Sequence, residues 1–222
     1  MRSFYRSLGA DLAGDVTLVC LADAIVAVAF GAVAVTAGLP AWVPVALSLA
    51  VFAGAAQFLF VAVIAAGGGV AAAVIAAVLV NTRLVPLSLA VGDLAGPGVL
   101  RALVGAHVVV DESVAFATAQ TDERRRRAAF WACGLALFVV WNAGVALGVL
   151  VGRHVPDADA LGLDAAFPAV LLALAVPALR DAATRRAALL GAALAVATTP
   201  FLPAGLPVLL APAVLLVPRG RS

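Results

Sequence analysis

Apolar residues dominate this chain in long runs, separated by short stretches rich in Gly, Pro and charged residues. The runs lie at about 16–37, 43–65, 70–91, 98–119, 128–151, 162–179, 187–200 and 204–217. A helix needs about 20 apolar residues to cross a bilayer. The pattern therefore predicts an all-α polytopic integral membrane protein with about seven or eight transmembrane helices, some of them kinked or re-entrant. The last two runs are short enough to form a re-entrant hairpin.

The composition excludes most other classes of protein. Of the 222 residues, 65% are hydrophobic and 12% are charged, against about 45–50% and 25% in soluble domains. A soluble enzyme or a nucleic-acid-binding protein is therefore excluded, and the lipid bilayer is the expected surrounding. The chain also lacks a phosphate-binding loop with its Lys, a His/Cys metal set and a nucleophile-elbow serine. We expect no enzymatic activity, no catalytic residue, no metal and no cofactor.

Arginine placement predicts the orientation, because basic residues concentrate in cytoplasmic loops. The clusters are Arg2 with Arg6, Arg124–Arg127, Arg180 with Arg185 and Arg186, and Arg219 with Arg221. All four clusters lie on the same side of the membrane if the less apolar run at 98–119 crosses it. If that run does not cross, another run must also fail to cross. We expect eight membrane segments in the cell membrane, with both termini cytoplasmic.

The expected organisation is a cytoplasmic segment over 1–15, one membrane domain over 16–217 and a cytoplasmic tail over 218–222. Similar Gly-Leu-x-Ala stretches open two runs, at 38–44 and at 162–168. They suggest a weak parallel repeat that relates 16–119 to 128–217, as in some transporters.

Polar side chains within apolar runs are costly and often functional. Those near mid-depth are Asp23, Gln57, Asn81, Arg83, His107, Asp111, Glu112 and Asn142. A structural alternative exists for each of them: Gln57 and Asn142 could tie helices together, and Arg83 could sit in a buried ion pair.

The run at 70–91 contains Asn81-Thr82-Arg83 and then Pro86. Pro86 has no N–H to donate to the carbonyl of Thr82, and its ring crowds that carbonyl. The sequence therefore predicts a helix break at this triplet, which would let Asn81 and Arg83 turn into one cavity. The guanidinium of Arg83 offers a planar fork for a carboxylate.

Three acids accompany this single arginine at depth, namely Asp23, Asp111 and Glu112. They cannot all remain ionised cheaply, so at least one should bind a proton near neutral pH, as a proton-coupled carrier requires. Asp111 and Glu112 are the first candidates, and Asp23 is the next. His107 lies four residues before Asp111; on a continuous helix the two would share a face, and His107 could relay the proton. The alternative is that Glu112 reaches water.

Three stretches together resemble the AzlC family of branched-chain amino acid exporters. They are Phe52-Ala53-Gly54-Ala55-Ala56-Gln57-Phe58, Val80-Asn81-Thr82-Arg83 and Val110-Asp111-Glu112-Ser113. The likeness covers roughly residues 25–180. The family pattern commonly has His and Tyr where this chain has Leu84 and Leu87, and Tyr in place of Val114, which leaves the substrate open.

The resemblance implies export of leucine, isoleucine and valine, sometimes methionine, together with a small membrane partner of the AzlD type. The expected mechanism is secondary transport driven by the proton-motive force. Substrate-binding residues would be Gln57, Asn81, Arg83, Asp111 and Glu112, and proton-coupling residues Asp111, Glu112, His107 or Asp23. Two alternatives stay open: a permease subunit driven by a separate ATPase, and a membrane scaffold that does not transport.

Overall fold

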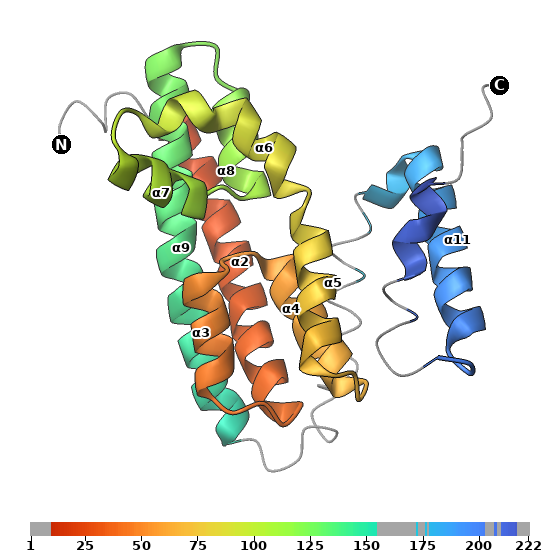
Figure 1. Ribbon diagram of the computed structural model, residues 1–222. Helices are drawn as coiled ribbons and strands as arrows, with labels where there is room; N and C mark the ends of the chain where they lie inside the picture. The colour runs from red at the N-terminus through yellow and green to blue at the C-terminus, as the bar shows by residue number, and fades with distance from the viewer. Residues whose placement is uncertain are drawn as a thin grey trace. The chain divides into compact units, whose positions relative to one another are not determined.

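The computed structural model describes residues 10–154, 178–202 and 210–216, with Leu172, Val176 and Pro207 (Figure 1). Its regular elements in these ranges are all helical. They are α2 (Ala10–Thr36), α3 (Trp42–Ala50), α4 (Gly54–Ala65), α5 (Val70–Asn81), α6 (Leu84–Val91), η1 (Gly92–Ala95), α7 (Val99–His107), α8 (Asp111–Thr118), α9 (Glu123–Arg153), η3 (Ala178–Arg180), α11 (Ala182–Thr198) and η4 (Ala211–Leu216). The predicted all-α class is confirmed.

The chain divides into two compact units. The first contains Met1–Gly54 and Asn81–Pro156, and the second contains Ala55–Val80 and Asp157–Ser222. In the second unit, Val63 of α4 packs against Ala73 and Ala76 of α5. There, too, α11 begins at Asp181, whose carboxylate accepts a hydrogen bond from Thr184 N–H at 2.7 Å. This bond holds the pKa of the exposed Asp181 carboxyl below its ordinary value.

Among the described residues, three helices are long and apolar enough to cross a membrane: Leu12–Thr36, Val70–Ala95 and Glu123–Arg153. They correspond to the predicted runs at 16–37, 70–91 and 128–151. The run at 187–200 falls on α11, which has 17 residues, and part of the run at 204–217 falls on η4. The run at 162–179 lies largely outside the described residues, as does the stretch at 162–168 that suggests the repeat.

α2 and α9 form the core of the first unit and run parallel. Glycines spaced four apart on α9 allow the close approach: Gly144 touches Ala24 and Ala27, whereas Gly152 touches Ala32 and Val35. Residue numbers rise together along both helices, so their N-terminal ends lie on the same side. Helices in lipid associate through such stripes of small residues, because van der Waals contact replaces the hydrophobic drive.

We expect Gly148→Ala to destabilise the first unit. A Cβ at Gly148 would press on the backbone carbonyl of Val28 and lie 3.0 Å from Ala32 N, and neither group can turn away. Overpacking of this kind costs about 1–3 kcal/mol. Gly14→Ala in α2 is the matched control, because nothing lies within 4 Å of its added Cβ. Thermal unfolding in detergent should show a lower midpoint for Gly148→Ala only. Equal midpoints for the two variants would contradict the close packing of α2 on α9.

The predicted run at 43–65 is broken at its centre. α3 ends at Ala50 and α4 begins at Gly54, and between them Phe52 adopts a left-handed conformation with φ of +41°. Ser48 Oγ donates to Asn142 Oδ1 on α9 at 2.7 Å, and Asn142 Nδ2 donates to Phe138 O at 2.8 Å. Asn142 therefore ties two helices together, which was the structural alternative for this residue.

The run at 98–119 does not cross as a single helix, which corrects the expectation from arginine parity. It forms two short helices, α7 with nine residues and α8 with eight. Nine residues reach only about 14 Å, roughly half of the hydrocarbon core. The chain enters beside the first turns of α9, where Arg127 Nη2 donates to Asp93 O at 3.4 Å, and it returns to the same end at Glu123. The segment is therefore re-entrant. Parity then requires another run to fail to cross.

Candidate functional site

Two helix breaks meet beside the middle of α9. The break at Val51–Ala53 places Phe52 against Phe138, with ring centroids 5.1 Å apart. The end of α7 places His107 against the same Phe138 at 5.3 Å and against Phe52 at 6.1 Å. Because Phe138 is the central residue of the 31-residue α9, both breaks lie at mid-depth of this span. Discontinuous helices at the bilayer midplane are where secondary transporters place their sites.

The third break, between α5 and α6, falls where Pro86 predicts it. α5 ends at Asn81 and α6 begins at Leu84, with Arg83 as its N-cap residue. The carbonyl of Thr82 accepts a hydrogen bond from Val85 N–H at 3.1 Å, because Pro86 has no N–H to offer. The break lies directly before Arg83.

Arg83 and Asp111 form an ion pair that joins the third break to the start of α8. Arg83 Nη2 lies 2.9 Å from Asp111 Oδ2, and the two side chains are 46% and 47% exposed. Asp111 is the first residue of α8, where the backbone dipoles favour a negative charge. The sequence names both residues as site candidates, and the structure brings them together in a pair that is open to a ligand.

Ser113 holds the backbone that presents Asp111. Its hydroxyl oxygen accepts a hydrogen bond from Val110 N–H at 3.0 Å. It also lies 2.9 Å from the carbonyl oxygen of Val108, to which it donates. The side chain is fully buried, so both bonds are shielded from water. Ser113 thus fixes the extended turn at Val108–Val110, and Val108 packs on Gly134 of α9.

Glu112 lies near titratable groups of other helices. Its carboxyl group is within electrostatic range of the Asp23 carboxyl on α2. Both acids are also within range of the Cys133 thiol on α9. Glu112 is also within electrostatic range of Asp111 and of Arg83. Asp111 forms the ion pair with Arg83, and Glu112 adds a second carboxyl group to the same cluster of charged residues.

The family model described as AzlC protein matches residues 19–155, which is more than half of the chain. The chain belongs to the AzlC family. It is therefore a membrane protein with a transport-related function, and the matched range contains Asp23, Arg83, Asp111 and Glu112. No curated protein and no solved structure matches the chain.

The structure supports the other site candidates of this AzlC protein less fully. Asn81 Oδ1 is buried and has no hydrogen-bond partner among the described residues, so this oxygen remains available as an acceptor. Gln57 is buried within α4. The expected placement of His107 and Asp111 on one helical face is wrong, because α7 ends at His107 and Val110 is extended before Asp111. A relay through His107 stays a prediction.

Sequence reasoning missed the aromatic contacts at the breaks. Phe52 and Phe138 occur in apolar runs that contain many similar residues, and neither is distinguished by spacing. The one signal was Gly54: a Cβ there would lie 2.9 Å from the Trp141 ring, so a residue without a side chain is needed. The motif Phe52-Ala53-Gly54 carries the family resemblance, but it does not reveal the left-handed Phe52.

Proposed function

We propose that this AzlC protein is a secondary carrier that exports branched-chain amino acids, driven by the proton-motive force, together with a small membrane partner of the AzlD type. The observation that carries the proposal is the half-exposed Arg83–Asp111 ion pair beside two helix breaks. The export direction and the partner follow from the family resemblance.

An amino acid is a zwitterion, and the Arg83–Asp111 pair offers one partner for each of its charges. The substrate carboxylate can take the guanidinium fork of Arg83 in a bidentate contact. The substrate ammonium can then pair with the carboxylate of Asp111. Each charged group of the protein loses one partner and gains another, so no charge is left buried and unpaired. A pair that can exchange in this way suits reversible binding.

The surroundings of the breaks suit an aliphatic side chain. Phe52, Val108 and Val109 are buried apolar residues in these turns, and Phe138 lines the same stretch of α9. Apolar walls discriminate weakly between aliphatic chains that differ by one methylene, by about 10- to 200-fold. We therefore expect leucine, isoleucine and valine to share the carrier.

The test is transport by the purified chain and its small partner in liposomes loaded with leucine. An imposed pH gradient without ATP should drive leucine across the membrane, and collapse of the gradient with a protonophore should stop it. Efflux that requires ATP and a separate ATPase would establish the permease-subunit alternative. Leucine movement equal to that of empty liposomes, with or without ATP, would favour the scaffold alternative.

A further inference from the structure

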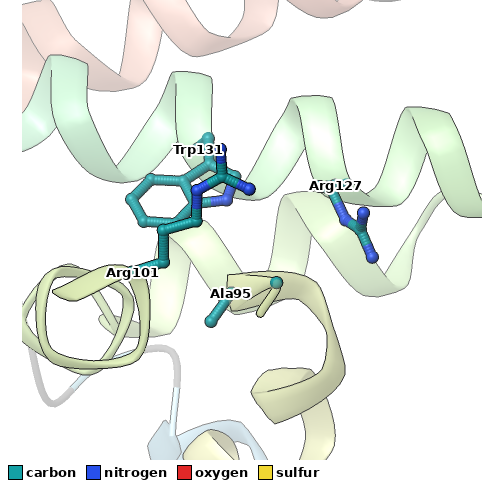
Figure 2. A pocket seen from close by; sticks show the side chains of 5 residues that line it. Ala95, Arg101, Arg127 and Trp131 are labelled. Atoms are coloured by element: carbon teal, nitrogen blue, oxygen red, sulfur yellow. The ribbon is translucent and has the colours of Figure 1, made fainter. Parts of the chain in front are cut away.

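A cavity of about 340 Å³ lies where η1 and α7 meet the first turns of α9, apart from the Arg83–Asp111 pair. It is lined by Ala95, Gly96, Arg101, Arg127 and Trp131. Figure 2 shows Arg101 reaching from α7 towards the indole of Trp131, with Arg127 further along α9. The volume is within the range of small-molecule sites, about 300–1,000 Å³.

The two arginines bring more positive charge to this cavity than the described residues neutralise. Arg101 forms no ion pair within the described part of the chain. Arg127 has only a long contact with Glu123, 3.5 Å between Nη2 and Oε1, and that glutamate side chain is 74% exposed. The second bond of Arg127, to Asp93 O, is also long at 3.4 Å. Two guanidinium groups therefore face the cavity with little competition from carboxylates.

The wall between the arginines is rigid. Trp131 Nε1 donates to Leu94 O at 3.2 Å, which fixes the indole plane against η1. Gly105 of α7 packs on Ala95 so closely that an added Cβ would lie 2.8 Å from the Ala95 Cβ. Both contacts hold α7 against η1, so the cavity is built into the fold.

The cavity also lies at the level of a membrane surface. The candidate span Val70–Ala95 ends at one of its lining residues, and the candidate span Glu123–Arg153 has just begun at two others. Trp is enriched at this depth in membrane proteins. Next to Arg101, α7 exposes apolar side chains that soluble surfaces rarely group: Val99 is 77% exposed, Leu100 75% and Leu103 65%.

We propose that this cavity binds the phosphate group of an acidic phospholipid. Guanidinium groups bind phosphate through paired N–H donors, and basic pockets between membrane helices bind acidic lipid headgroups. The acyl chains would lie along Val99, Leu100 and Leu103. A bound lipid would join α7 to α9 and so brace the re-entrant segment that carries Asp111.

Native mass spectrometry of the full chain in detergent tests the proposal. The probes are dioleoylphosphatidylglycerol and, as a zwitterionic comparison, dioleoylphosphatidylcholine. We expect one retained phosphatidylglycerol per chain, and a loss of affinity of about tenfold or more in Arg101→Gln and in Arg127→Gln, since each removes one charge-assisted contact to the phosphate. The matched control is Arg124→Gln, which removes a charge from the same turn of α9 but does not line the cavity. It should lose less affinity than either.

Three results would overturn the proposal. The first is an equal loss in Arg124→Gln and Arg101→Gln, which would indicate diffuse attraction to the arginine cluster. The second is equal retention of phosphatidylcholine. The third is displacement of the lipid by glycerol 3-phosphate at the same concentration, which would assign the cavity to a soluble phosphate compound. Arg101→Lys keeps the charge without the fork and should bind at an intermediate level, which keeps the test informative if Arg101→Gln does not fold.

Discussion

Arg83→Lys is expected to lower amino acid efflux by about tenfold or more, although the positive charge is kept. A guanidinium presents two parallel N–H donors to a carboxylate, whereas an ammonium is a point charge without that geometry. The affected step is substrate binding, so the loss should appear in KM and in kcat/KM. Leucine efflux from liposomes over a range of internal concentrations measures both. Arg153→Lys, in the last turn of α9, is the matched control and should transport like the parent.

A double variant separates a substrate-binding pair from a merely structural one. Removing one partner of an ion pair leaves a charge unpaired, whereas removing both often restores stability. If Arg83 and Asp111 only hold α6 to α8, Arg83→Gln with Asp111→Asn should regain both folding and transport. If the pair binds the zwitterion, the double variant should fold, as judged by thermal unfolding, and remain inactive. Recovered efflux in the folded double variant would contradict the proposed site.

The sequence pattern was sufficient to predict the class of fold and the position of one break. The long apolar runs around Phe30 and Phe138 are spans because lipid requires about 20 apolar residues in helical form. Pro86 predicts a helix break because it has no N–H to donate within the helix. Arg83, Asp111 and Glu112 stand out because charged residues at depth are rare.

The re-entrant segment at 98–119 and the break at Val51–Ala53 could not be predicted in the same way, because hydropathy measures how apolar a segment is and not where the chain turns. Phe52 gives no local signal for its left-handed conformation, since that conformation is stabilised by contacts with α9. Similarly, the turn at Val108–Val110 depends on one buried hydroxyl, that of Ser113. The run at 98–119 is less apolar than the other runs, and the expectation that it crosses came from the parity of the arginine clusters.

The second large effect concerns Glu112. The sequence left Asp111 and Glu112 as equal candidates for the coupled proton. In the part of the chain that the structure describes, Asp111 forms an ion pair with Arg83 and Glu112 forms none. Asp111 Oδ2 lies 2.9 Å from Arg83 Nη2. Glu112 is within range of the like-charged Asp23, and two neighbouring carboxyl groups in a low dielectric tend to share a proton. The geometry therefore favours Glu112, with Asp23 beside it, as the proton-binding residue.

Glu112→Gln is accordingly expected to abolish leucine accumulation driven by a pH gradient while leucine–leucine exchange continues, because an amide cannot titrate but can still fill the space. Asp111→Asn should instead weaken exchange and accumulation together, since it removes the partner of the substrate ammonium. In Asp23→Asn the carboxyl group within electrostatic range of Glu112 is lost, and the pH at which efflux is half-maximal should change. Transport in liposomes with and without a gradient measures all three variants. A parental response to the gradient in Glu112→Gln would move the coupling to another group, with Asp23 the next to test.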